Sequence, residues 1–550
     1  MTNRISGIGV SPGRVVGPAF RMVEAVSEPD AAAILAPSER EAEAARIAPA
    51  AARVAEELTA RARRASGEAK DVLDATALMA SDPALADAAR AAVLDHGKTA
   101  PRAVWEAAED VARTLTAAGG YLAERARDVR DVRDRIIAAL DGTQAPGIPT
   151  HPEPFVLVAR DLAPADTATL DAEAVLALVT EEGGPTSHTA ILARALGLPA
   201  VVAARGITDL RDGTPVLVDG TDSVVVPDPA PDVPGDAPPA ALPGPFAGHG
   251  QTSDGFPVAL LANVGDPRST SAAVDVGAEG IGLFRTEFCF LDRTEPPSFD
   301  EQVTAYRSVF SQFPERKVVV RTLDAGADKP LPFLTAQGEP NPALGVRGLR
   351  TARHTPSLLD DQLRAISAAA LGTDAEVWVM APMVATAIEA AAFAERARAH
   401  DLRTVGVMVE VPSAAVTADA VVAACDFVSI GTNDLAQYTL AADRQLGELA
   451  ELTDPWQPAL LQLVELIGAA GRRAGKPVGV CGEAASDPLL AAVLVGLGVT
   501  SLSMSARAIP AVAASLAAVS YDDCQHLARI AVEATDPADA RRRARAALGT

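Results

Sequence analysis

The second half of the chain contains eight short apolar segments rich in β-branched residues, and helix-like segments separate most of them. Strands that alternate with helices favour a parallel sheet, and eight such strands in about 300 residues are typical of a TIM barrel. We therefore predict a (β/α)8 barrel over residues 252–550 of this 550-residue chain. The eight segments cover residues 258–265, 280–288, 317–324, 376–384, 404–412, 427–435, 477–485 and 501–509.

Nearly every one of these segments ends in a polar or reactive residue. In a TIM barrel the strand ends gather on one face, and that face holds the active site. A chance alignment of the chosen segments is the alternative, but a purely structural protein would not need such endings. The residues are Asn263, Arg285, Arg321 with Asp324, Glu410, Asn433 with Asp434, Cys481 with Glu483, and Ser503 with Ser505.

Two carboxylates, Glu410 and Asp434, end neighbouring predicted strands. Mg²⁺ prefers a few carboxylates together with substrate oxygens and water. Arg285, Arg321 and Arg444 would surround them, and arginine forks bind phosphate and carboxylate in bidentate fashion. The pattern predicts a small, phosphate-bearing anionic substrate, although ordinary salt bridges could account for any one of the arginines.

Cys481 ends the seventh predicted strand, immediately before Gly482 and Glu483. A thiol there could exchange a proton with a carbon atom of the substrate. A single cysteine in an apolar segment is more often part of the core, so this residue taken alone favours a structural role.

Residues 183–200 read GGPTSHTAILARALGLPA, and they place one of only seven histidines at the start of a predicted helix. The surrounding segment, 174–203, has the pattern strand, glycine turn, helix, strand. Free N–H groups and the helix dipole favour negative charge at that position and leave the imidazole of His188 neutral and nucleophilic. The pattern is compatible with a phosphorylated histidine, and equally with a helix cap or a polar surface residue.

The N-terminal half has strand patterns on both sides of a helical block. Residues 38–142 have a helical period, with about four helices in hairpins, so this block is predicted to be inserted into an α/β domain made of residues 1–37 and 143–226. Residues 227–251 begin with a proline-rich stretch and are predicted to be a linker. The predicted strands are 5–20, 155–160, 174–179, 200–203 and 215–226; the predicted helix starts are Ser38 with Glu41, Ser81-Asp82-Pro83 and Thr99-Ala100-Pro101; the predicted helix ends are Gly97 and Gly142.

Composition excludes several classes of function. A net charge of −24 disfavours nucleic-acid binding, and it suits either a basic protein partner or simple solubility. No apolar stretch is long enough for a membrane span, and the first residues lack a signal peptide, so we expect a cytoplasmic protein. Four scattered cysteines fit reduced thiols rather than a disulfide framework.

Seven motifs, taken in order, resemble those of the Enzyme I family of the bacterial sugar phosphotransferase system, the phosphoenolpyruvate–protein phosphotransferases. The resemblance runs from GIGVSPG near the N-terminus to about Pro510. The histidine motif alone also occurs in pyruvate phosphate dikinase and phosphoenolpyruvate synthase. It is therefore the ordered series of all seven motifs that resembles the Enzyme I family specifically. The motifs are GGPTSHTAILARALGLPAVV, GLFRTEFCFLDR, RTLDAGADKPLP, NPALGVRGLR, VGVMVEVPSA, SIGTNDLAQYTLAADR and VCGEAASDP.

The resemblance implies that phosphoenolpyruvate binds the barrel with Mg²⁺ and phosphorylates His188 on Nε2. Pyruvate leaves, and the phosphoryl group passes to the carrier protein HPr, which the helical block 38–142 would dock. The family acts as a homodimer through its barrel. The implied substrate-binding residues are Arg285, Arg321, Lys329, Arg347, Asn433, Asp434 and Arg444; the metal ligands are Glu410 and Asp434; Cys481 is the proton donor, and Thr167 orients the histidine.

Two features depart from the family pattern. The family connects its domains through a long helix, whereas residues 227–245 are proline-rich here, and Thr76 stands where the docking subdomain often has histidine. Because the histidine and the donor site belong to different domains, we expect a large domain motion. The alternatives are a synthase or dikinase relative, which needs an upstream nucleotide-binding domain that we do not find, and a non-catalytic regulator.

Overall fold

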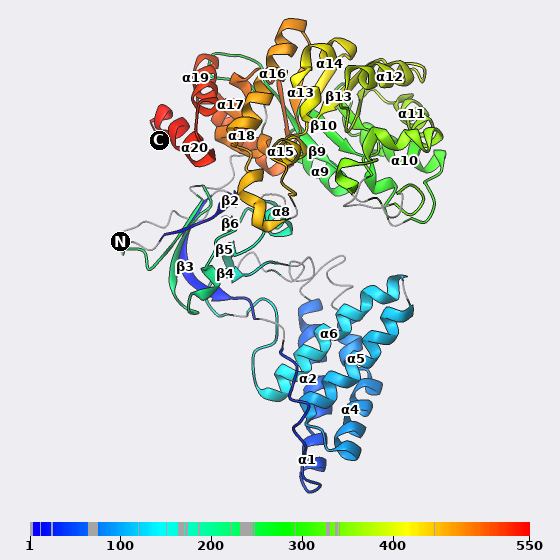
Figure 1. Ribbon diagram of the computed structural model, residues 1–550, viewed down its shortest axis with the longest axis vertical. Coiled ribbons are helices and arrows are strands. Elements are labelled where there is room, and N and C mark those ends of the chain that lie inside the picture. The colour runs from blue at the N-terminus through cyan, green and yellow to red at the C-terminus, as the bar shows by residue number, and fades with distance from the viewer. Residues whose placement is uncertain are drawn as a thin grey trace. The chain divides into compact units, whose positions relative to one another are not determined.

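The chain folds into two compact units, one before the proline-rich segment and one after it. The structure is a computed structural model, and each unit is described by itself (Figure 1). The described residues are 4–549 except 12, 24–25, 64–74, 119, 150, 163–169, 171–173, 185–186, 222, 231–245, 247, 292, 326–330, 336–338, 340 and 445.

The first unit contains a mixed eight-stranded sheet with the order β1-β8-β7-β3-β4-β5-β6-β2. Strands β3 to β6 are parallel neighbours, and the other pairs are antiparallel. Both flanks of the helical block contribute strands, as the sequence predicts. The strands are β1 (Ile5–Ser6), β2 (Ile8–Ser11), β3 (Arg14–Arg21), β4 (Phe155–Ala159), β5 (Val175–Thr180), β6 (Ala200–Val202), β7 (Pro215–Asp219) and β8 (Val224–Pro227).

Helix α8 (His188–Leu196) packs against β2, β5 and β6 of this sheet. The sheet has its own core of valines and alanines, including Val156, Val179 and Val218, all of them fully buried. Pro227, placed by the sequence in the linker, instead ends β8 because it continues the ladder with β7. The proline-rich residues 231–245 lie outside the described part of the chain.

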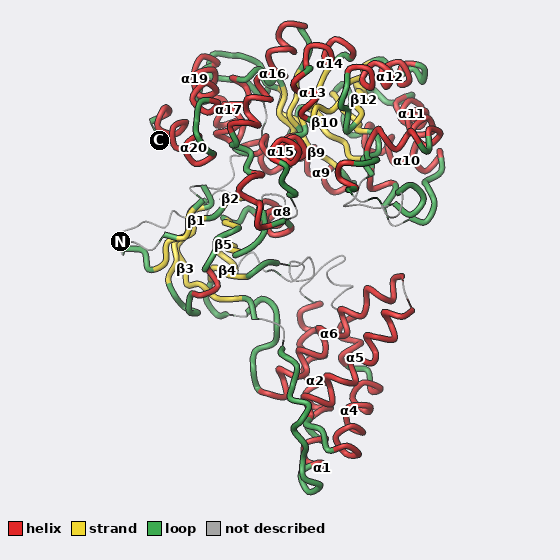
Figure 2. The backbone as a smooth tube through the Cα atoms, in the orientation of Figure 1, coloured by secondary structure: helices red, strands yellow, loops and turns green. Residues whose placement is uncertain are grey.

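The helical block forms a bundle (Figure 2). Its core is separate from that of the sheet and includes Ile47, Leu58, Val104 and Ile137. The sheet and the bundle thus each have a hydrophobic core of their own among the described residues. The described helices of this block are α1 (Arg40–Ala44), α2 (Ile47–Ala62), α4 (Pro83–His96), α5 (Ala100–Ala118) and α6 (Gly120–Asp141).

Most of the predicted helix ends in this block are confirmed. Asp82 caps α4 by accepting the Ala84 N–H at 2.9 Å, and Gly97 and Gly142 take left-handed φ angles of 67° and 68°. The capping box at Ser38 is wrong. Helix α1 begins one residue later, after Glu39, whose side chain accepts the Ala36 N–H at 3.0 Å instead of capping the helix.

The second unit is a closed barrel of eight parallel strands, β9 to β16 in sequence order, surrounded by helices (Figure 1). The predicted TIM barrel is therefore confirmed. The strands are β9 (Ala259–Val264), β10 (Gly280–Arg285), β11 (Lys317–Arg321), β12 (Glu376–Ala381), β13 (Thr404–Val409), β14 (Phe427–Ile430), β15 (Val478–Val480) and β16 (Ser501–Met504). The helices are α9 (Pro267–Asp275), α10 (Phe299–Phe310), α11 (Pro356–Ala370), α12 (Ala387–Arg398), α13 (Pro412–Val416), α14 (Ala418–Ala424), α15 (Thr432–Leu440), α16 (Pro458–Ala474), α17 (Pro488–Gly496), α18 (Ile509–Ala517), α19 (Tyr521–Val532) and α20 (Pro537–Leu548).

All eight strands are shorter than the apolar segments that predicted them. The segment 427–435, for example, stops being a strand at Ile430, and α15 begins at Thr432. The segment 280–288 ends as a strand at Arg285. Apolar residues after a strand still pack against the surrounding helices, so hydrophobicity alone does not mark where the ladder ends.

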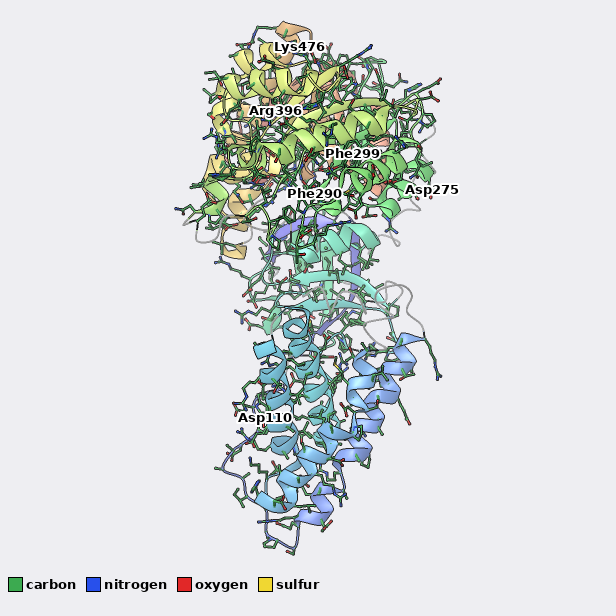
Figure 3. The ribbon with its side chains drawn as sticks, turned by 90° about the vertical axis from the view of Figure 1, so that its right-hand side faces the viewer. Asp110, Asp275, Phe290, Phe299, Arg396 and Lys476 are labelled. Carbon is green, nitrogen blue, oxygen red and sulfur yellow. The ribbon has the colours of Figure 1, made fainter. Side chains whose placement is uncertain are left out.

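Two hydrophobic layers hold the barrel unit together. The inside of the barrel is filled by residues such as Leu283, Met408 and Phe427, which form one cluster with Cys481. The layer between strands and helices includes the fully buried Phe290, and the partly buried Phe299 packs against this layer (both are labelled in Figure 3). None of the described helices combines the length and apolarity that a bilayer crossing requires.

We predict that Asp487→Ala destabilises the barrel unit by about 2–4 kcal/mol, because two interactions are lost at once. Its carboxylate caps α17 through the Leu489 and Leu490 N–H groups and accepts the indole N–H of the fully buried Trp456 at 2.8 Å. Denaturant unfolding followed by tryptophan fluorescence measures the change. Asp536→Ala, which removes the cap of α20, serves as control and should cost only about 1 kcal/mol; equal losses would contradict the prediction.

Candidate active site

The polar residues predicted at the strand ends gather at the carboxyl end of the barrel. Arg285 and Arg321 are the last residues of β10 and β11, Glu410 follows β13, and Cys481 follows β15. Because all eight strands are parallel, these positions share one face.

Arg321 lies buried between two carboxylates. Its Nη2 contacts Glu287 Oε1 at 2.8 Å, and its Nη1 contacts Asp324 Oδ2 at 3.2 Å. Burial alone would lower the pKa of Arg321, but Glu287 and Asp324 hold that pKa above its ordinary value. The guanidinium is therefore permanently charged and held from two sides.

Arg347 continues the same network of ion pairs. Its Nη2 contacts Asp324 Oδ2 and its Nη1 contacts Asp434 Oδ1, each at 3.2 Å, and Nη1 also donates to the Tyr438 hydroxyl at 3.3 Å. Tyr438 donates in turn to the Ala343 carbonyl. Arg444 approaches the other oxygen of Asp434 at 3.9 Å. The structure thus brings together three of the predicted arginines, Arg321, Arg347 and Arg444.

Several polar atoms of this network are buried without a hydrogen-bond partner in the described structure. They are Glu287 Oε2, Arg321 Nε, Asp324 Oδ1, Arg347 Nε and Thr432 Oγ1. Buried polar groups in proteins nearly always have partners, and the exceptions are common at sites that bind ligands. The carboxyl-end face therefore has both cationic and anionic groups available to a ligand.

Glu410 is 1% exposed, and its Oε1 accepts the Met383 N–H at 2.6 Å. Burial, reinforced by the negative charges of Asp434 and Asp324, raises the pKa of Glu410 to about 8, against the opposing effect of Arg321. A Cβ on Gly431 would lie 2.5 Å from Glu410 Oε2, so glycine at the end of β14 lets this carboxylate fit.

This donor set suits a hard cation such as Mg²⁺. The groups are all oxygens, their negative charges oppose one another, and the buried Asp324 Oδ1 has no partner. Among the described residues, no three histidine, cysteine or acidic side chains converge as a complete metal cage. Two carboxylates completed by substrate and water would fit Mg²⁺, which rarely uses an all-protein cage.

Cys481 is 3% exposed inside the barrel, with its Sγ 3.6 Å from the Ile430 carbonyl oxygen. Burial raises the pKa of its thiol to about 11, although a hydrogen bond with Ser429 favours the thiolate. Asn263 donates to the Cys481 carbonyl at 3.1 Å and accepts from Ser503 at 2.6 Å. Asn433 accepts the Glu483 N–H at 3.2 Å and so connects the segments after β14 and β15.

Arg285 is exposed, and although its backbone belongs to the β10–β11 ladder, its side chain has no ion pair within the described structure. Lys329 and Thr167 lie outside the described residues. Their predicted roles stay predictions.

The backbone at His188 has the predicted arrangement. Helix α8 begins at His188, and Ser187 caps it by accepting the Ala190 N–H at 3.3 Å. Gly183, at φ 96°, permits the turn that precedes it, and the Thr189 hydroxyl donates to Asp161 at 3.4 Å. The His188 side chain itself lies outside what is described.

Known proteins match the chain over its whole length. Three family models match: PEP-utilising enzyme, N-terminal (residues 6–125), mobile domain (151–223) and PEP-binding domain (247–521). The phosphoenolpyruvate-protein phosphotransferase of Streptomyces coelicolor is 52% identical over 556 residues, covering 100% of both chains. The chain belongs to the phosphoenolpyruvate–protein phosphotransferase family, Enzyme I.

Two more distant sequence relatives with the same name support the assignment. The phosphoenolpyruvate-protein phosphotransferase of Haloferax volcanii is 41% identical and covers 87% of each chain, and that of Bacillus subtilis is 37% identical and covers 92% of each. A solution structure titled Enzyme I is 35% identical over 41% of this chain and 94% of its own, with a TM-score of 0.36.

Two residues of this Enzyme I site escaped the sequence analysis. Tyr438 lies inside α15, where only its contacts with Arg347 and Ala343 distinguish it. Glu287 lies in a 3-10 turn (Glu287–Cys289) that the sequence assigned to a strand. Recognising Arg285 as the last residue of that strand would have placed Glu287 on the catalytic face.

We predict that iodoacetamide leaves Cys481 unmodified in the native protein at pH 7. With a pKa of about 11, about one thiol in ten thousand is ionised at that pH, and the side chain is buried. The rate of alkylation is measured by mass spectrometry of the Cys481 peptide. Below the pKa of the thiol, this rate should rise about tenfold each time the pH is raised by one unit. Urea-unfolded protein is the control, and complete modification of native protein within minutes at pH 7 would contradict the prediction.

Proposed function

We propose that the chain transfers the phosphoryl group of phosphoenolpyruvate to His188 and from there to HPr. The observation that carries this proposal is the buried cluster in which Arg321, Arg347 and Arg444 surround Glu410 and Asp434 beside a protonated thiol. Such a site suits a small trianion that is protonated on carbon after it loses phosphate.

The arginines have the geometry to hold phosphate and carboxylate oxygens. Arg321 and Arg347 each keep a buried Nε without a described partner, so each can donate to a ligand without giving up its ion pairs. By resemblance to the family, Arg285, Lys329 and Asn433 complete the substrate contacts. The exposed Arg285 has its guanidinium available for this role.

Glu410 and Asp434 are the residues we propose as Mg²⁺ ligands. Bound there, the ion would neutralise charge on the phosphate and on the departing enolate. Binding a dication also keeps Glu410 ionised against the repulsion of Asp434 and Asp324.

In the transfer step, the neutral imidazole of His188 forms a bond from Nε2 to phosphorus while the bond from phosphorus to the enol oxygen breaks. The electron pair of the broken bond stays on the oxygen of the enolate, beside the arginines. Cys481 gives its proton to C3 of the enolate, which yields pyruvate, and the thiolate recovers a proton from water. A pKa of about 11 keeps that proton on sulfur until a strongly basic carbon is present. By resemblance, Thr167 orients the histidine ring.

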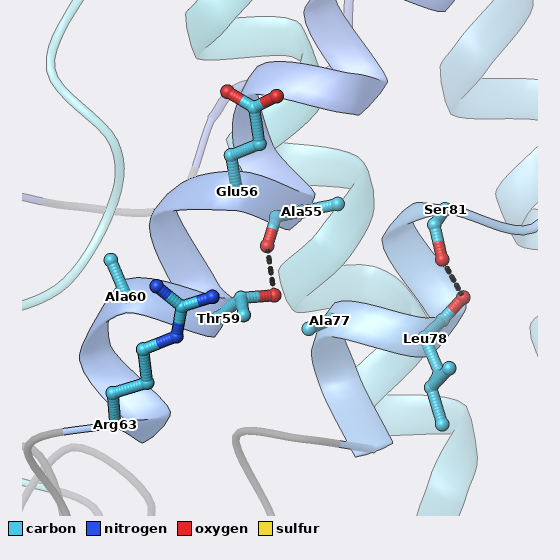
Figure 4. Close-up of a pocket in the computed structure, with 8 residues that line it drawn as sticks. All are labelled: Ala55, Glu56, Thr59, Ala60, Arg63, Ala77, Leu78 and Ser81. Carbon is cyan, nitrogen blue, oxygen red and sulfur yellow. Dashed lines mark hydrogen bonds between the residues drawn. The ribbon is translucent and has the colours of Figure 1, made fainter.

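The helical bundle offers a docking groove for HPr. A groove of about 520 Å³ lies beside α2 and is lined by Thr59 of that helix, by Arg63 directly after it, and by Leu78 and Ser81 (Figure 4). The Thr59 and Ser81 hydroxyls donate back to carbonyls of Ala55 and Leu78, which leaves Leu78, 72% exposed, as an apolar contact. An exposed apolar side chain beside a groove suits contact with another protein.

We further propose a cytoplasmic homodimer that associates through the barrel. Leu344, Ile388, Val416 and Leu446 are 54–82% exposed, and they lie on the segments that follow four consecutive strands, β11 to β14. Exposed apolar side chains on these segments fit a self-complementary contact. We propose four parts for the chain. They are the phosphohistidine domain (1–37 with 143–226), the helical HPr-binding subdomain (38–142), the linker (227–251) and the barrel (252–550). His188 must reach both the barrel and HPr, which requires domain motion.

A first experiment separates this proposal from the synthase or dikinase alternative and from a non-catalytic regulator. The full chain with Mg²⁺ is incubated with phosphoenolpyruvate or with ATP, each labelled in its terminal phosphate. We expect acid-labile label from phosphoenolpyruvate and none from ATP. Label from ATP alone, or from neither, would overturn the proposal.

A second prediction concerns the division of labour between the two units. Glu410→Ala should lower labelling by phosphoenolpyruvate by at least a hundredfold, because it removes a metal ligand. Back-transfer from phosphorylated HPr to His188 should keep its rate, since that step does not use the barrel. His188→Ala is the control that must lose both reactions, and loss of both in Glu410→Ala would contradict the assignment.

A further inference from the structure

Glu287 is a buried carboxylate that the proposed mechanism does not use. It is 5% exposed, and it follows β10 by two residues, in the turn after Arg285 and Thr286. Burying a charge is costly unless something compensates it, so its contacts require an explanation.

One oxygen of Glu287 serves two donors on the neighbouring segment. Oε1 accepts from Arg321 Nη2 at 2.8 Å and from the Asp324 backbone N–H at 3.0 Å. The carboxylate therefore fixes both the guanidinium of Arg321 and the backbone that presents Asp324.

Thr286 strengthens the same connection. Its hydroxyl donates to the Arg321 carbonyl at 2.9 Å and accepts from Gln362 Nε2 at 3.0 Å, while Gln362 Oε1 accepts the Leu323 N–H at 2.8 Å. The chain between Arg321 and Asp324 is thus held from both sides. These hydrogen bonds fix the backbone around Arg321, and Glu287 and Asp324 hold its guanidinium.

Ion pairs connect the fixed segment, residues 321–324, to Asp434, a proposed metal ligand. Asp324 Oδ2 is 3.2 Å from both Arg321 and Arg347, and Arg347 is 3.2 Å from Asp434. Glu287 is the end of this series of ion pairs and has no second arginine of its own in the described structure. If it were neutral, Asp324 and Glu410 would be the remaining carboxylates that attract Arg321.

Stability does not explain the arrangement. A buried ion pair contributes little net stability compared with apolar residues of similar volume, and Glu287 Oε2 is buried without a described partner. Catalysis explains it better, because transfer of a phosphoryl group depends on donors held in place before the reaction.

We infer that Glu287 is a positioning residue, which holds the Arg321 guanidinium in the orientation that binds the transferring phosphoryl group. The inference rests on the proposed function. It assigns Glu287 no contact with substrate, and its effect passes through Arg321.

The test uses Glu287→Gln in the full chain. Glutamine keeps the shape and one acceptor oxygen for both donors, so it removes the charge and little else. We expect kcat/KM for labelling by phosphoenolpyruvate to fall about tenfold to a hundredfold, the usual result of a misplaced catalytic group. Glu287→Asp, which keeps the charge, should recover part of the rate.

A double-mutant cycle with Arg321→Lys identifies the route of the effect. If Glu287 acts through Arg321, Glu287→Gln should cost less than about threefold in the Arg321→Lys background, because coupled residues are not additive. The same loss in both backgrounds, or no loss in the single variant, would overturn the inference.

Glu279→Gln is the matched control. Glu279 precedes the same strand, β10, at its opposite end, and it accepts the Leu260 and Gly250 N–H groups at 2.7 and 3.1 Å. It should lower the unfolding temperature without changing kcat/KM. Wild-type protein that takes no label from phosphoenolpyruvate would instead refute the proposed function, which keeps the two failures distinct.

Discussion

The buried series of ion pairs from Glu287 through Arg321, Asp324 and Arg347 to Asp434 is the interaction on which the barrel site depends. Each arginine lies between two carboxylates, which keeps its charge in a site from which water is largely excluded. Desolvated guanidinium groups interact with an anion far more strongly than solvated ones do. The same carboxylates that hold the arginines also supply the oxygens for a cation. One network of ion pairs therefore orients the arginines that bind the anion and supplies the carboxylates that bind the metal ion.

The barrel and its strand-end residues could be predicted because each signal is local. Eight apolar segments with polar endings require only the parallel topology to bring Arg321, Glu410, Asp434 and Cys481 to one face. The helix start at His188 was equally local, since a serine cap and a positive-φ glycine determine it. The ends of the strands were less predictable, because residues beyond the ladder, such as Thr286 and Thr432, are as buried as the strands themselves.

The contacts between segments could not be predicted from the sequence. Glu287 and Asp324 lie 37 positions apart, and their shared hydrogen bond depends on how the turn after β10 meets the turn after β11. Tyr438 likewise meets Arg347 across 91 positions. Ser38 failed as a cap because α1 begins at Arg40, which puts Glu39 and not Ser38 at the capping position. Periodicity and spacing do not encode such pairings, which arise from tertiary packing.

The central claim is that phosphate moves from phosphoenolpyruvate to one histidine at the first residue of α8. The most direct measurement is to expose the full chain briefly to phosphoenolpyruvate and Mg²⁺, quench it in alkali and map the adduct by mass spectrometry. The account predicts a phosphate on His188 and no adduct in His188→Ala. A phosphate on another residue, or undiminished labelling of His188→Ala, would contradict it.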